Sequence, residues 1–125
     1  MTKWILVVDD DDEIREVVQA SLEEFGGWQT ITAASGQEAL QIAKTDVLDA
    51  ILLDISMPGM DGFEVCSALQ AEPRTQNIPV IVLTAKALLS DRQQFLDLDI
   101  AGVIIKPFDP INIWRQVAQI LGWSV

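Results

Sequence analysis

Residues 51–62 have the sequence ILLDISMPGMDG, in which an apolar run carries one carboxylate at its end. Pro58, Gly59 and Gly62 come soon after that carboxylate, and proline and glycine interrupt both helices and strands. The pattern predicts a buried strand that ends near Asp54 and turns at once into a loop. Asp54 is therefore expected at a strand tip, where its side chain is presented to other groups.

Four more short apolar runs have the composition of strands. Together with the run before Asp54, they predict strands at 4–8, 28–33, 50–53, 80–83 and 103–105. The run at 28–33 mixes polar and apolar residues, as a more peripheral strand does. The first run is apolar throughout and ends in four aspartates, which is typical of a strand buried on both faces.

Helical patterns follow the first three strands. In the first helix, apolar residues recur at helical spacing between a cap at Asp11 or Asp12 and a stop at Gly26-Gly27; they are Ile14, Val17, Val18, Leu22 and Phe25. Ser35, followed by Glu38, is a capping-box pattern that predicts a second helix to about Lys44. A third helix is expected over 63–71.

Two further helices are predicted towards the C-terminus. Ser90 can cap a short one, whose inward-facing residues would be Phe95, Leu96 and Leu98. The last helix is expected to have Asp109 as N-cap and Pro110 as its first residue, and to end at Gly122.

The last helix also suggests a contact surface. Ile111, Trp114 and Ala118 form a stripe beside the expected core residues, which are Ile113, Val117, Ile120 and Leu121. Trp114 either anchors a partner on this stripe or packs along a neighbouring helix.

Strands that alternate with helices form a parallel sheet covered by helices on both faces. The prediction is an α/β fold with a five-stranded parallel sheet in the order 2-1-3-4-5, doubly wound with five helices, in a single domain spanning 1–125. Sites in such sheets lie beyond the carboxyl ends of the strands, where the strand order reverses. The polar residues at those ends are Asp9, Asp10, Asp54, Thr84 and Lys106.

Composition excludes several classes of protein. The net charge of −11, from 19 acidic and 8 basic residues, argues against binding to nucleic acid or to an anionic membrane surface and favours a cation or a basic partner. The single cysteine, Cys66, cannot form an internal disulfide, and no signal-peptide or membrane-span pattern is present. The expectation is a cytoplasmic protein.

The polar strand ends suggest a specific chemistry. Three carboxylates close together repel one another unless a cation lies among them, and Mg²⁺ prefers such oxygen ligands. A carboxylate can also attack phosphorus when the charge of the transferred group is neutralised. Lys106 supplies a positive charge, and the Thr84 hydroxyl can donate a hydrogen bond to a phosphoryl oxygen. These residues are a complete set for Mg²⁺-assisted phosphoryl acceptance on Asp54.

Four motifs resemble the receiver domains of two-component response regulators, including the single-domain chemotaxis regulators. The motifs are ILVVDD at 5–10, LDISMPGMDG at 53–62, IPVIVLTA at 78–85 and IKPF at 105–108. Their spacing also agrees with the family, because 84 − 54 = 30 and 106 − 84 = 22. The resemblance extends from Lys3 to about Leu121 and implies the flavodoxin-like receiver fold.

The resemblance implies a role for each motif residue. Asp54 would be the phosphoacceptor, supplied by a histidine kinase or a phosphotransfer protein. Asp9, Asp10, Asp54 and the backbone carbonyl of Ser56 would hold Mg²⁺, while Thr84 and Lys106 would bind the phosphoryl group. The peptide bond before Pro107 would be cis. The protein would signal to a downstream protein target as a monomer or a phosphorylation-dependent homodimer, with no turnover beyond its own phosphorylation and autodephosphorylation.

Three positions bear on how the switch would work. The family usually has Tyr or Phe three residues before the lysine, as a relay from the threonine, and this chain has Val103. Ser56 and Lys86 occupy the positions that flank the path of the hydrolytic water, so they would set the lifetime of the acyl phosphate.

Other interpretations of the same residues remain. The acids at 9–12 can cap a helix, and Asp54 can form a turn. Thr84 can be an ordinary strand-end residue, and Lys106 can be a solvated surface charge. Two other functions are a non-phosphorylated pseudo-receiver that acts as a binding module, and a hydrolase with an aspartyl-phosphate intermediate. Such hydrolases typically have a second acid where this chain has Ser56, and the chain has no histidine to serve as a general base. A chain ending at Val125 would be a stand-alone receiver, and an excised piece would have lost a DNA-binding or enzymatic domain.

Overall fold

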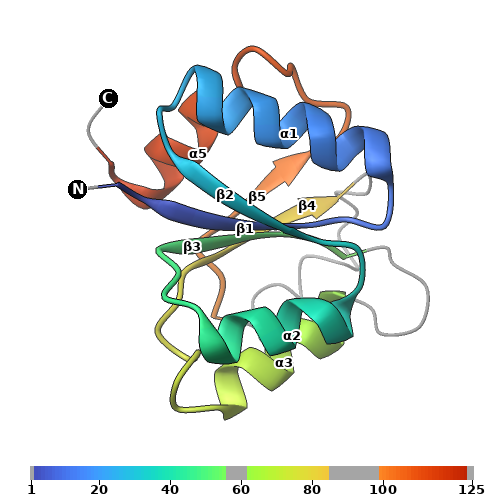
Figure 1. The fold of residues 1–125 in the computed structure, drawn as a ribbon, viewed down its shortest axis with the longest axis vertical. Helices are drawn as coiled ribbons and strands as arrows, with labels where there is room; N and C mark the ends of the chain where they lie inside the picture. The colour runs from blue at the N-terminus through green and yellow to red at the C-terminus, as the bar shows by residue number, and fades with distance from the viewer. Residues whose placement is uncertain (1, 56–61, 85–98, 124–125) are drawn as a thin grey trace.

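The computed structural model describes residues 2–55, 62–84 and 99–123. Five strands form one sheet in the order β2-β1-β3-β4-β5, and every neighbouring pair is parallel (Figure 1). The strands are β1 (Trp4–Val8), β2 (Gln29–Ala33), β3 (Ala50–Asp54), β4 (Val80–Thr84) and β5 (Gly102–Ile105). The predicted strand order and the five predicted strands are therefore confirmed, each boundary within one residue.

The described residues contain four helices, not the five that were predicted. They are α1 (Asp12–Glu24), α2 (Gly36–Thr45), α3 (Gly62–Ala71) and α5 (Ile113–Leu121). The helix predicted from Ser90 falls in 85–98, outside the described residues. Across the ranges that the structure describes, no helix is long and apolar enough to cross a membrane.

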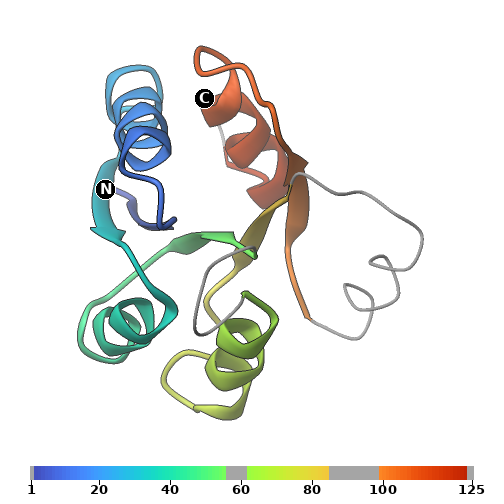
Figure 2. The same cartoon turned by 90° about the vertical axis from the view of Figure 1, so that its right-hand side faces the viewer.

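The molecule has three layers. Helices α1 and α5 cover one face of the sheet, and α2 and α3 cover the other (Figure 1, Figure 2). Strand β1 supplies both cores, because successive side chains point to opposite faces: Ile5 and Val7 pack towards α1 and α5, whereas Leu6 and Val8 pack towards α2 and α3. This two-sided burial explains why the central strands are apolar throughout.

The predicted caps of the first two helices are confirmed. The Asp11 carboxylate accepts hydrogen bonds from the backbone N–H groups of Glu13 and Ile14, and Ser35 Oγ accepts one from Glu38. These bonds satisfy N–H groups that have no partner within the helix. Both helices therefore begin where local sequence signals place them.

The predicted start of the last helix was wrong. Helix α5 begins at Ile113, and Asp109 caps the turn that precedes it: its carboxylate accepts from the Ile111 N–H at 2.9 Å and from the Asn112 amide at 2.7 Å. An Asp-Pro pair does not distinguish a turn from a helix start, because the same hydrogen bonds to the aspartate side chain stabilise both.

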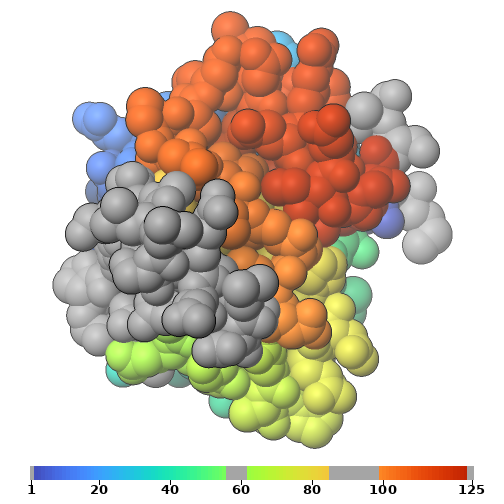
Figure 3. Space-filling model, turned by 180° about the vertical axis from the view of Figure 1, so that it is seen from behind, coloured from blue at the N-terminus to red at the C-terminus, as the bar shows by residue number. Residues whose placement is uncertain are grey.

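Helical spacing alone does not decide which apolar residues of the helices are buried. Val17 of α1 and Phe25, the residue after this helix, are exposed, although both have the spacing of core residues. Ala118 of α5 is buried in the core, so it is not part of an exposed stripe with Ile111 and Trp114, as had been predicted. Trp114 packs partly against the same core, as in the alternative interpretation. Seen from behind, α5 and the segment before it form the upper surface, with α3 below (Figure 3).

Candidate functional site

Parallel pairing brings the polar strand ends to one edge of the sheet. Asp9 follows β1, Asp54 and Thr84 are the last residues of β3 and β4, and Lys106 follows β5. The register pairs Val8 with Leu53, Asp54 with Leu83 and Thr84 with Ile105. These four polar residues therefore lie at nearly the same level of the sheet. The sequence prediction that these residues share one edge is confirmed.

The strand order explains why the site forms between β1 and β3. After β1 the chain enters α1 on one face of the sheet, and after β3 it continues to α3 on the other. Connections that diverge in this way leave the carboxyl ends of adjacent strands uncovered, and ligands bind there in doubly wound sheets.

Three carboxylates meet at this point. Asp9, Asp10 and Asp54 each offer one oxygen, and these oxygens lie within 4.8 Å of one another. Asp9 and Asp54 are buried and Asp10 is exposed. Ligand oxygens about 2.1 Å from Mg²⁺ are at most about 4.2 Å apart, so small adjustments fit this cluster to that ion. Hard carboxylate donors with one side open to water are suited to Mg²⁺, which keeps several of its waters.

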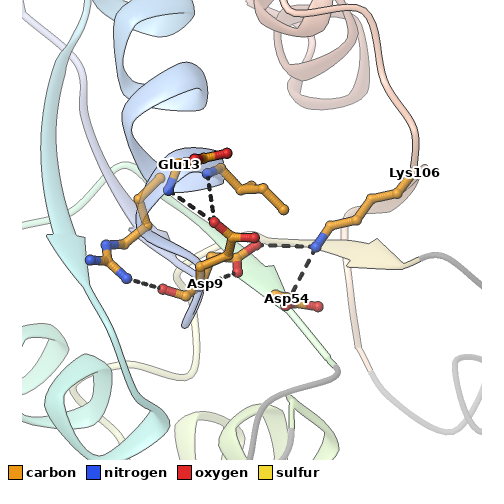
Figure 4. Close-up of polar contacts among 7 residues, drawn as sticks. Asp9, Glu13, Asp54 and Lys106 are labelled. Carbon is orange, nitrogen blue, oxygen red and sulfur yellow. Dashed lines mark hydrogen bonds and ion pairs between the residues drawn. The ribbon is translucent and has the colours of Figure 1, made fainter.

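Lys106 supplies a positive charge to the same cluster. Its Nζ lies 3.1 Å from Asp9 Oδ2 and 3.4 Å from Asp54 Oδ2, so the ammonium bridges the ends of β1 and β3 (Figure 4). The Lys106 backbone N–H donates to the Thr84 carbonyl at 2.8 Å, which fixes the base of the side chain against β4. The Lys106–Pro107 peptide bond is cis, as the resemblance implied.

Asp9 is buried at a position that disfavours its charge. Burial raises the pKa of the Asp9 carboxyl, and the negative charge of Asp54 raises it further. The Asp11 N–H, which donates to Asp9 Oδ1 at 2.9 Å, and the Lys106 ammonium act in the opposite direction, but the pKa of Asp9 remains above its usual range. A bound cation would relieve this cost by neutralising the carboxylate.

The remaining predicted site residues differ in how far the structure describes them. Thr84 is buried at the end of β4, one residue beyond the register partner of Asp54. Val103 lies on β5 and is 36% exposed. Because the residue is valine, this position of the strand carries no aromatic ring. Ser56 and Lys86 fall outside the described residues, as does the whole loop at 56–61.

Two features of the site were not predicted from the sequence. Arg15 of α1 donates from Nη1 to the Asp9 carbonyl at 2.6 Å. An apolar groove of about 440 Å³ lies between α1 and the segment after β5, and Lys106 forms part of its wall together with Val17, Phe108 and Pro110. The one sequence signal for the groove was Phe108, which lies beside the motif lysine. The contact of Arg15 has no sequence signal, because a backbone carbonyl is present at every residue.

Comparison with known proteins agrees with this geometry. The family profile described as the response regulator receiver domain matches residues 5–118. The alkaline phosphatase synthesis transcriptional regulatory protein PhoP of Bacillus subtilis is 40% identical over 124 residues, which cover 99% of this chain and 50% of that protein. The chain spans about half the length of other curated relatives as well.

Two solved structures show the same fold. The chemotaxis protein CheY4 of Vibrio cholerae superposes with a TM-score of 0.89 at 30% identity, covering 96% of this chain and 99% of that one. The receiver domain of the sensor histidine kinase PA1611 of Pseudomonas aeruginosa gives 0.85 at 30% identity, covering 98% and 99%, and that structure has a magnesium ion coordinated in its active site cleft. The family match, the strand order and the acidic site agree, and the chain belongs to the response regulator receiver domain family of two-component signalling.

Proposed function

We propose that this chain is a phosphorylation-activated switch in which Asp54 accepts a phosphoryl group with the help of Mg²⁺. The observation that carries the proposal is the position of the Asp54 carboxylate, which lies 3.4 Å from the Lys106 ammonium and within the acidic cluster of Asp9 and Asp10. Membership of the receiver family supports it, because receiver domains are generally phosphoacceptors.

In the proposed reaction, a carboxylate oxygen of Asp54 attacks phosphorus. The bond from phosphorus to the donor breaks, and the departing group keeps the electron pair, which leaves an acyl phosphate on Asp54. Asp9, Asp10, Asp54 and the Ser56 carbonyl would hold Mg²⁺, which would supply positive charge to offset that of the phosphoryl group.

Lys106 and Thr84 would act on the transferred group. The Lys106 ammonium, now shared between two carboxylates, would turn to the new phosphoryl oxygens and offset their charge. Thr84, one residue beyond the partner of Asp54, would donate its hydroxyl hydrogen to another of these oxygens. Phosphorylation would therefore change contacts at the carboxyl ends of β3, β4 and β5. Such a local change can shift a conformational equilibrium.

The proposed donor is a histidine kinase or a phosphotransfer protein, and the proposed output is contact with a downstream protein. A donor must bring its phosphoryl group to Asp54, so its surface would cover the apolar groove whose wall includes Lys106. We propose a single receiver unit over 1–125 that works as a monomer or as a homodimer formed on phosphorylation.

Incubation with Mg²⁺ and a small acyl-phosphate donor, followed by intact mass measurement, tests the proposal. Wild-type protein should gain one phosphoryl group, and the gain should disappear in Asp54→Asn and when Mg²⁺ is chelated. Failure of the wild type to gain phosphate, or equal gain in Asp54→Asn, would refute the proposal. The first result would favour a pseudo-receiver that binds partners without phosphorylation.

A further inference from the structure

Arg15 ties the start of α1 to the loop that carries the acidic cluster. Its Nη1 donates to the backbone carbonyl of Asp9 at 2.6 Å, and its Nη2 forms an ion pair with the carboxylate of Asp12. The Arg15 side chain is only 16% exposed, whereas that of Asp12 is 82% exposed. The guanidinium therefore lies inward, beside the loop, and not in solvent along the helix surface.

The contacted carbonyl has a particular importance. It belongs to the peptide unit that joins Asp9 to Asp10, and a peptide unit is planar. A hydrogen bond that fixes its oxygen also fixes the direction in which the chain enters Asp10. Since Asp10 is exposed and begins the connection to α1, packing against the core does little to fix its direction.

Asp9 itself is already held at several other atoms. Its backbone N–H donates to the Ala33 carbonyl at 3.1 Å, and its two carboxylate oxygens accept from the Asp11 N–H and the Lys106 ammonium. Arg15 adds a hydrogen bond at the backbone carbonyl of Asp9, the group that is bonded to Asp10. A guanidinium suits the task because its planar fork donates in two fixed directions at once.

We infer that Arg15 is a positioning residue for the cation site: it holds the Asp9–Asp10 peptide so that both carboxylates face the same ion. The inference rests on the proposed Mg²⁺ site. Residues that orient metal ligands without touching the metal typically change its affinity by about 10- to 100-fold when replaced.

A different explanation is that Arg15 and Asp12 form only a surface ion pair three residues apart in a helix. Such pairs affect helix stability slightly and do not affect distant ligands. Asp12→Asn separates the two explanations, because it removes the ion pair and leaves the contact between Arg15 and the Asp9 carbonyl.

Calorimetric titration of the full chain with MgCl₂ provides the test. Arg15→Gln should weaken Mg²⁺ binding by about tenfold, since glutamine lacks the length and the planar fork that bring a donor to the Asp9 carbonyl. Arg15→Lys should give an intermediate affinity, because one ammonium does not provide the planar fork. Asp12→Asn should bind like the wild type. Thermal unfolding in a chelator, measured for each variant, reports folding independently of the metal.

Wild-type Mg²⁺ affinity in Arg15→Gln would overturn the inference, as would equal weakening in Asp12→Asn and Arg15→Gln. If Arg15→Gln does not fold, Arg15→Lys decides in the same way. These results would leave the proposed metal site intact. Absence of Mg²⁺ binding by the wild type would instead refute the metal site and the inference together.

Discussion

Lys106 and Asp9 are joined by a contact of 3.1 Å between Nζ and Oδ2, although they are 97 residues apart in the chain. The same ammonium contacts Asp54. Lys106 therefore neutralises part of the charge of the acidic cluster. A cation that binds there must share or displace these contacts.

Replacement of Lys106 by methionine should strengthen Mg²⁺ binding and slow phosphorylation of Asp54. Methionine keeps an unbranched side chain but removes a like charge close to the ion, and two unit charges about 4 Å apart interact by roughly 1–4 kcal/mol between water and a protein surface. The expected gain in affinity is about tenfold. Calorimetric titration with MgCl₂ measures it, and Lys44→Met on the exposed surface of α2 is the matched control. Unchanged affinity in Lys106→Met would show that the ammonium does not compete with the ion.

Replacement of Asp9 by asparagine should stabilise the metal-free protein at neutral pH. The pKa of Asp9 is raised in the folded state, so the folded state binds the proton more tightly than the unfolded chain does. The resulting stabilisation is complete below the ordinary carboxyl pKa of 3.8 and is lost as pH rises through the raised value. Asparagine carries no charge to bury and should remove this loss.

Urea denaturation in a chelator, from weakly acidic to neutral pH, measures the effect. The free energy of unfolding of the wild type should fall relative to Asp9→Asn as pH rises. Added Mg²⁺ should stabilise the wild type more than the variant. A ligand that binds the folded state stabilises it, and Asp9→Asn removes one of the proposed carboxylate ligands. Parallel pH profiles for the two proteins would contradict the expectation.

Replacement of Gly62 by alanine should destabilise the fold and disturb the site. A Cβ at this position would lie 2.4 Å from Ile55 Cα, in the residue that follows Asp54. The Gly62 N–H also donates to the Ile55 carbonyl at 3.1 Å, so the close approach is part of the native structure. Forced overpacking of this kind costs about 1–3 kcal/mol or more.

Gly27→Ala is the matched control for Gly62→Ala. Gly27 has a φ of +72° and open space around it, so its replacement should cost about 1 kcal/mol from the left-handed conformation alone. Urea denaturation compares the two losses, and intact mass measurement compares phosphorylation. Equal losses of stability, with normal phosphorylation of both, would show that Ile55 moves aside without consequence.

Replacement of Ser35 by alanine should lower stability without affecting the site. Ser35 Oγ accepts from the Glu38 N–H at 3.2 Å at the start of α2, and loss of such a cap costs about 1 kcal/mol. Ser35→Asn, which can make the same bond, should restore most of the loss. Thermal unfolding measures stability, and the initial rate of phosphorylation measures function. A slower rate in Ser35→Ala would reveal a connection between α2 and the site.

Local patterns were sufficient for the elements whose signals have no competing meaning. The strand at Ala50–Asp54 follows from an apolar run that ends at a loop, and Ser35 caps a helix because its oxygen satisfies a neighbouring N–H. At Asp109 the same kind of signal was ambiguous, because carboxylates cap turns and helices alike.

The burial of single helix residues depended on the neighbouring elements. Val17 and Ala118 both have the spacing of amphipathic helices, yet Val17 borders an open groove and Ala118 is buried against the core that α1 and α5 share. Helical period identifies an apolar face, but the packing of the adjacent helix decides which edge of that face is covered.

The sequence alone determined the strand order and the set of polar residues at one edge, because parallel strands that alternate with helices have few permitted topologies. It thereby placed Asp9, Asp54 and Lys106 together. The tertiary structure decided how they meet: which oxygens the Lys106 ammonium bridges, that burial raises the pKa of Asp9, and that Arg15 donates to the Asp9 carbonyl. Distances and burial arise from packing between segments far apart in the chain, and no local pattern encodes them.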